Sequence, residues 1–118
     1  MKELLERLRG SPGIDEALIM TLDGILVTSL NESDRNERIA AFVSATLLAM
    51  EKDAEELGLT PFRRLTLWEA KGRLIVLPLA DFALVVVADR DTDLSFALME
   101  TAGLAKGLVR QSKIDVEV

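Results

Sequence analysis

Residues 33–58 carry the pattern of apolar and polar positions around which we expect the fold to be arranged. At the roughly 100° per residue of an α-helix, one broad apolar stripe forms that is wide enough to cover a sheet. The stripe consists of Ile39, Phe42, Val43, Thr46, Leu47, Met50, Ala54 and Leu57.

The opposite side of this predicted helix is uncharged over its middle, where Ala41, Ala45 and Leu48 recur. A helix on the surface of a monomer usually carries charges on that side. We therefore predict that one side covers the chain's own core and that the other side meets a second copy. A tolerant, alanine-rich surface would give the same pattern, because scattered exposed apolar residues are common in folded proteins.

Two segments before this helix have the pattern of a β-hairpin. Residues 14–21 and 25–29 flank the pair Asp23-Gly24. Such a pair is typical of a tight turn, because glycine accepts the positive φ that these turns require. We expect the two segments to be antiparallel neighbours.

Three further strands are predicted after the long helix. Residues 62–70 have the alternation of side chains between two faces that is typical of a strand, and Arg63 and Arg64 are typical of an edge strand. Residues 73–79 and 82–88 are apolar on both faces. A sheet with such strands must be covered from both sides, so helices are needed on each face.

Helices are predicted at both ends of the chain, over residues 2–9 and from 94 to about 110. The resulting order of elements predicts an α/β (α+β) fold, in which a five-stranded antiparallel sheet has helices on both faces. We expect one domain over residues 1–118. The final residues 114–118 alternate strictly, which indicates either a short strand on a free sheet edge or a frayed terminus.

Composition and charge exclude several classes of function. The net charge is −6, which disfavours nucleic acid and anionic membranes as partners, because both require a basic face. Cysteine and histidine are absent, so thiol chemistry, the usual zinc sites and histidine acid–base catalysis are not expected. The start of the chain contains acidic residues and does not resemble a signal peptide. We expect a cytoplasmic protein.

No motif indicates an enzyme, a cofactor or a metal site. The glycines of residues 10–13 are not followed by the lysine of a phosphate-binding loop. Asp89, Asp91 and Asp93 are similar to the opening of a calcium loop, but Leu94 stands where that loop requires glycine. We therefore expect these aspartates to cap the last helix and to face solvent.

Four segments together resemble the roadblock family, which includes dynein light chains and the bacterial MglB proteins. They are the strand IDEALI at 14–19, the turn LDG at 22–24, the alanine-rich helix at 39–58 and the run LADFALVVVAD at 79–89. The resemblance implies a profilin-like sandwich with strand order 2-1-5-4-3, one long helix on one face and two helices on the other.

The resemblance also implies a homodimer formed through the long helix and the third strand. Together with the uncharged side of the helix, it predicts a dimer interface that contains Ala41, Ala45, Leu48, Lys52, Arg64, Thr66 and Trp68. Trp68 is either an anchor of that interface or packs under a helix. Arg63 and Arg64 either guard an edge strand or contact an acidic partner.

Family members in bacteria and archaea often accompany small Ras-like GTPases, which they regulate or hold without binding nucleotide themselves. The resemblance therefore implies a regulator or scaffold of such a GTPase, with no chemistry of its own. Two alternatives remain open at this point. One is a structural adaptor that tethers other proteins, and the other is a sensor of a small ligand.

Overall fold

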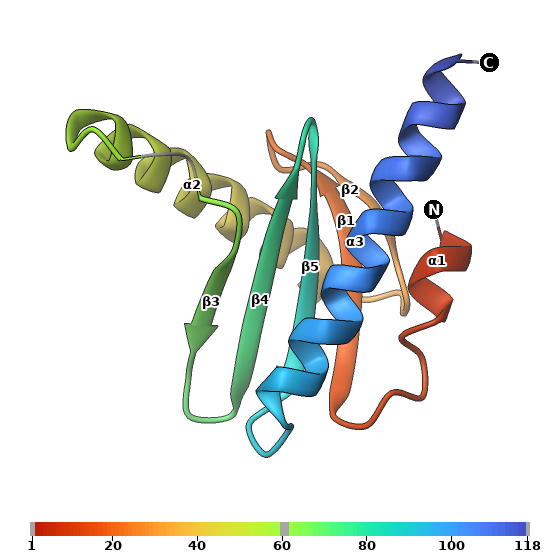
Figure 1. Ribbon diagram of the computed structural model, residues 1–118. Helices are drawn as coiled ribbons and strands as arrows, with labels where there is room; N and C mark the ends of the chain where they lie inside the picture. Colours follow the sequence, from red (N-terminus) through yellow and green to blue (C-terminus); the bar gives the residue numbers. More distant parts are fainter. Residues whose placement is uncertain (1, 60–61, 118) are drawn as a thin grey trace.

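The computed structural model describes residues 2–59 and 62–117, which form three helices and five strands (Figure 1). The helices are α1 (Lys2–Glu6), α2 (Asp34–Glu56) and α3 (Leu94–Glu117), and the strands are β1 (Ile14–Thr21), β2 (Leu26–Ser29), β3 (Leu65–Trp68), β4 (Gly72–Leu79) and β5 (Phe82–Asp89). All neighbouring strands are antiparallel, in the order β2-β1-β5-β4-β3. The predicted sandwich and strand order are confirmed.

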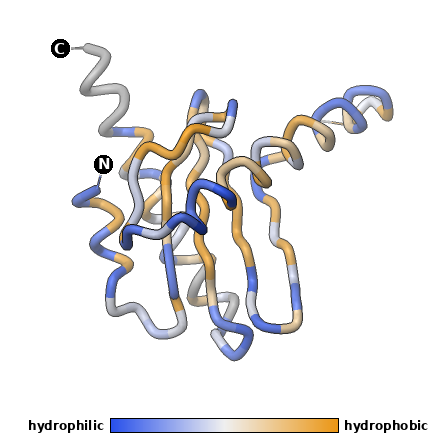
Figure 2. The backbone as a smooth tube through the Cα atoms, turned by 180° about the vertical axis from the view of Figure 1, so that it is seen from behind, coloured by the Kyte–Doolittle hydropathy of each residue, from blue (hydrophilic) through white to orange (hydrophobic). Residues whose placement is uncertain are grey.

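The core has two layers, one on each face of the sheet. On one face, α2 packs on side chains of β1, β4 and β5. On the other face, α1, the turn after it and α3 pack on alternate side chains of the same strands. Figure 2 shows the central strands as hydrophobic along most of their length, whereas the turns between strands are more hydrophilic. The predicted cover on both faces is therefore confirmed.

Helix α2 has defined ends. The Ser33 side chain accepts a hydrogen bond from the Arg35 backbone N–H at 3.2 Å, as an N-cap residue does. At the other end, Gly58 has a φ of +72° and Leu59 N donates to Ala54 O at 2.8 Å. Together with the bond from Gly58 N to Glu55 O, this is a Schellman motif, which satisfies carbonyls that the helix leaves free.

The buried side of α2 differs in part from the predicted stripe. Val43 and Leu47 are buried as expected, but Asn36 and Ala40 are buried too. Phe42 was predicted to be in the core and is 53% exposed. The sheet contacts a narrower arc of the helix than the predicted stripe, so Phe42 at the margin of the stripe remains in solvent.

Leu57, also predicted to be in the core, is 74% exposed. Figure 1 gives the reason, because the C-terminal part of α2 extends past the edge of the sheet beyond β3. There is no sheet beneath this part of the helix for Leu57 to cover.

The predicted bounds of three elements are wrong. The first helix was predicted over 2–9 but ends at Glu6, where the chain passes into a turn. The third strand was expected over 62–70 but pairs with β4 only from Leu65 to Trp68, because the preceding residues connect the sheet to the end of α2. The backbone of α3 continues to Glu117, whereas the helix was predicted to end near Arg110 with a strand or frayed segment after it. Neither glycine nor proline follows Gly107, so nothing in the sequence stops the helix. In the described part of the chain, no helix combines the length and the apolar character that crossing a membrane requires.

The turn between β4 and β5 contains a strained residue. Leu79 pairs with Phe82, so Ala80 and Asp81 form a two-residue turn. Ala80 has a φ of +48° and is the one non-glycine residue in the described part of the chain with a positive φ. A side chain carrying a Cβ is disfavoured in that conformation.

We expect Ala80→Gly to raise the free energy of unfolding by about 1 kcal/mol, because relief of the strain exceeds the added entropy of the unfolded chain. Ala70→Gly is the matched control, since Ala70 lies in the other two-residue turn without a positive φ. The control should lower stability by about 0.5–1 kcal/mol. Urea denaturation of both variants tests this, and equal effects of the two changes would contradict it.

Candidate functional site

The side of α2 that faces away from the sheet is apolar and exposed. Leu48 is 71% exposed and Phe42 is 53% exposed, although both are large and hydrophobic. We define the outer face of α2 by its exposed residues Ala41, Phe42, Ala45, Leu48, Ala49 and Lys52. Charges are absent from the middle of this face, which is unusual for a helix in contact with water.

Strand β3 presents a second exposed apolar residue at the edge of the sheet. Trp68 is 61% exposed, so the alternative in which a helix covers it is wrong for this chain by itself. Trp68 lies opposite Arg73 on β4, and the Arg73 guanidinium carbon is 3.9 Å from the centre of the indole ring. This cation–π contact holds the indole against the sheet while most of its surface faces solvent.

The two features lie at the same edge of the molecule. β3 is the last strand of the sheet and pairs with β4 alone. Figure 1 shows α2 passing behind the sheet and leaving it beyond β3. The free backbone groups of β3 and the outer face of α2 are thus both exposed at this edge of the molecule.

The structure places the residues of the predicted interface on α2, on β3 or directly before β3. Six of them are exposed, namely Ala41, Ala45, Leu48 and Lys52 on α2, Arg64 directly before β3, and Trp68 on β3. Thr66, also on β3, is half-buried. Phe42 and Ala49 also belong to this surface, although neither was predicted to be part of it. Phe42 had been placed in the core, and its position at the margin of the apolar stripe was the available signal.

A buried carboxylate, which sequence analysis did not single out, fixes the start of α2. Glu16 on β1 is 3% exposed. Its Oε1 accepts hydrogen bonds from the backbone N–H groups of Ala17 and Leu30 at 3.0 Å and of Asn31 at 3.2 Å. Its Oε2 accepts from the side-chain amide of Asn31 at 3.0 Å and that of Asn36, in the first turn of α2, at 3.4 Å.

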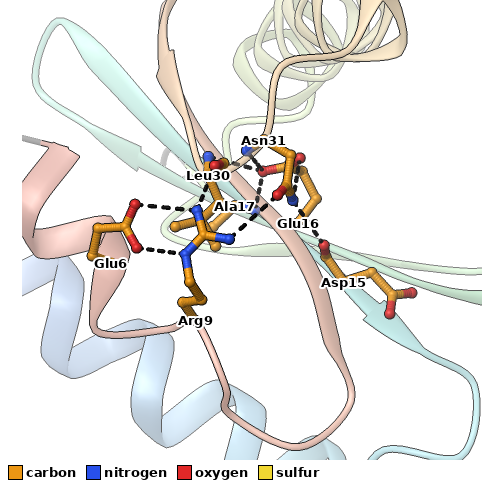
Figure 3. A network of polar contacts seen from close by, with 7 residues as sticks. All are labelled: Glu6, Arg9, Asp15, Glu16, Ala17, Leu30 and Asn31. Atoms are coloured by element: carbon orange, nitrogen blue, oxygen red, sulfur yellow. Dashed lines mark hydrogen bonds and ion pairs between the residues drawn. The ribbon is translucent and has the colours of Figure 1, made fainter.

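An ion pair extends this network to α1, as Figure 3 shows. Arg9 Nη2 donates to Leu30 O at 2.6 Å, and Arg9 Nε lies 2.5 Å from the carboxylate of Glu6. The hydrogen bond from Arg9 lowers the pKa of Glu6 below its usual value. Both are exposed, so the pair adds little stability, but it connects α1 with the loop that leads into α2.

Of the three aspartates near the start of α3, all are exposed as predicted, but Asp93 alone caps the helix. Asp93 Oδ1 accepts a hydrogen bond from Ser95 N at 2.9 Å, which is the geometry of an N-cap. Asp89 Oδ1 accepts from Asp91 N at 3.4 Å. Among the residues that the structure describes, no group of three or more acidic, histidine or cysteine side chains is arranged to hold a metal ion.

We expect Glu16→Gln to lower the free energy of unfolding by about 2 kcal/mol, because an amide NH₂ would then face donors that now bind a carboxylate oxygen. Asp15→Asn, a similar change at the exposed neighbouring residue, should alter it by less than about 0.5 kcal/mol. Thermal or urea unfolding measures both. A Glu16→Gln protein as stable as the parent would show that the network does not hold α2.

Comparison with known proteins agrees with this fold. The solved Roadblock/LC7 domain from Streptomyces avermitilis has a TM-score of 0.86 at 21% identity, with 97% of this chain and 98% of that chain covered. Myxococcus xanthus MglB has a TM-score of 0.86 at 18% identity, with 94% and 93% covered. Profilin IA from Acanthamoeba castellanii has a TM-score of 0.65 at 16% identity, with 94% and 97% covered, so the fold is profilin-like.

The sequence itself assigns the family. No curated protein matches the chain. The model of the Roadblock/LC7 domain matches residues 1–89, which include the whole sheet, α1 and α2. Because this match spans most of the chain, the protein belongs to the Roadblock/LC7 domain family.

Proposed function

We propose that this protein is a homodimeric regulator or scaffold of a small Ras-like GTPase that acts in the cytoplasm by protein–protein binding. Membership of the Roadblock/LC7 family and the likeness to MglB support a role of this kind. The observation that carries the proposal is the exposed outer face of α2 beside the free edge of β3. Such a surface suits association with proteins.

We propose that a second copy covers the outer face of α2. Ala41 and Ala45 let two helices approach closely, and Leu48 supplies a large apolar side chain next to them. Two-fold symmetry allows this one surface to serve both partners. In the same dimer the free edges of the two β3 strands pair, and Trp68 is buried as an anchor near the joint.

We expect Leu48→Glu to weaken the dimer about 100-fold or more, because two carboxylates would be buried near the symmetry axis. Met99→Glu is the matched control. Met99 is on α3, on the other face of the sheet, and is 71% exposed, as Leu48 is. Light scattering over a range of concentrations measures the mass of each protein. A monomeric parent, or a Leu48→Glu dimer as tight as the parent, would contradict the proposed interface.

The regulatory role predicts that the GTPase partner binds in a nucleotide-dependent way. Switch loops of these GTPases change their order with the γ-phosphate, and a regulator acts only if it binds the two states with different affinity. We expect affinities for the GDP form and for a GTP-analogue form to differ by about tenfold or more.

Calorimetry with a Ras-like GTPase from the same organism, loaded with each nucleotide, measures this difference. The protein alone, mixed with GTP, is the control and should show no binding or phosphate release. Equal affinities for both forms would indicate a tether rather than a regulator. Absence of binding to either form would overturn the proposed function.

A further inference from the structure

A hollow of about 430 Å³ lies between the β1–β2 turn and the middle of α2. Its lining residues are Leu22, Asp23, Ser44, Leu47, Leu48 and Glu51. Neither β3 nor Trp68 contributes to it. Leu48 also belongs to the outer face of α2, so the hollow borders that face.

The walls of the hollow are fixed by hydrogen bonds and close packing. Ser44 Oγ on α2 donates to Leu22 O at 2.7 Å, which attaches the turn to the helix. Gly24 has a φ of +99°, and a Cβ placed there would lie 3.2 Å from the Cβ of Ser44. The turn is thus held close against α2, at a position where glycine is required.

The rim carboxylate of the turn is also held in place. Thr21 Oγ1 donates to Asp23 Oδ1, and the same hydroxyl accepts a hydrogen bond from Ile25 N at 3.0 Å. Thr21 N donates to Ile25 O at 2.8 Å and closes the hairpin. Asp23 therefore has a restricted position at the mouth of the hollow.

The hollow combines an apolar interior with an acidic rim. Leu47 is 5% exposed and forms the floor, and the exposed Leu22 and Leu48 form the sides. Asp23 and Glu51 are both exposed and contribute the only charges of the lining. Within the described part of the chain neither carboxylate has an ion-pair partner.

A site of this character is complementary to a long basic side chain. Lysine and arginine have an aliphatic stem that packs on apolar surface and a cationic head that requires carboxylate partners. A purely apolar side chain would remove water from both carboxylates without supplying a charged partner, which is unfavourable. An acidic side chain would be repelled by Asp23 and Glu51, as well as by the net charge of −6.

We propose that this hollow receives an arginine or lysine side chain from the surface of the partner GTPase. The stem would lie on Leu22 and Leu47, and the head between Asp23 and Glu51. This inference rests on the proposed function and adds to it the chemistry by which the partner is recognised. It places the docking site next to the outer face of α2, which the second copy is proposed to cover.

The test replaces both rim carboxylates, in the double variant Asp23→Lys/Glu51→Lys, and measures affinity for the nucleotide form of the GTPase that binds the parent more tightly. We expect a loss of affinity of tenfold or more and a weaker dependence of binding on salt concentration. The control is Asp53→Lys/Glu56→Lys, which makes the same change in net charge at two exposed residues of α2 outside the hollow. The control should change the affinity less than threefold.

Asp23 also accepts a hydrogen bond within the turn, so the single variant Glu51→Lys separates binding from folding. It should retain the melting temperature and mass of the parent and still lose affinity. If Glu51→Lys and the double variant bind as tightly as the parent, or if the control loses as much affinity, the inference is overturned while the proposed function stands. A parent protein that binds neither nucleotide form overturns both.

Discussion

The central strands of the sheet bury side chains on both faces, and the rest of the structure depends on this constraint. Leu18 and Val85 point to α2, whereas Ile19 and Val86 point to α1 and α3. Exposing either set to water would cost far more than the stability of a small domain, so helices must cover both faces. One long helix covers the first face alone, because α1 and α3 are both committed to the second.

As a result, α2 has one side in the core and a second, apolar side in solvent. One side of the helix is part of the core, and Glu16 holds its first turn through Asn31 and Asn36. The other side has Leu48 and Phe42 in solvent. Because the helix is anchored at its start and packed on the sheet, its outer face has a fixed position, which a binding surface needs. The family assignment and the exposed face thus support the same kind of function.

Much of the fold was predictable because local signals agreed with the overall arrangement. Gly24 fixed the first turn, and apolar residues on both faces of the later strands required two layers of helices. The strand order came from resemblance, since pairing between distant segments leaves little trace in a single sequence. Phe42 was misplaced because periodicity gives the direction of a side chain but not the width of the surface that covers it.

The remaining differences have similar causes. Residues 114–118 alternate between apolar and acidic, yet a helix without a stop signal continues to Glu117. The burial of Glu16 was not predicted, because the carboxylate is satisfied by hydrogen-bond donors that lie 14 to 20 residues further along the chain.

Isotope-filtered NMR on an equal mixture of labelled and unlabelled chains can establish whether a second copy covers the outer face of α2. We expect intermolecular contacts from the methyl groups of Ala41, Ala45 and Leu48, and from the indole of Trp68. Intermolecular contacts confined to α3 near Met99, or none at all, would contradict it.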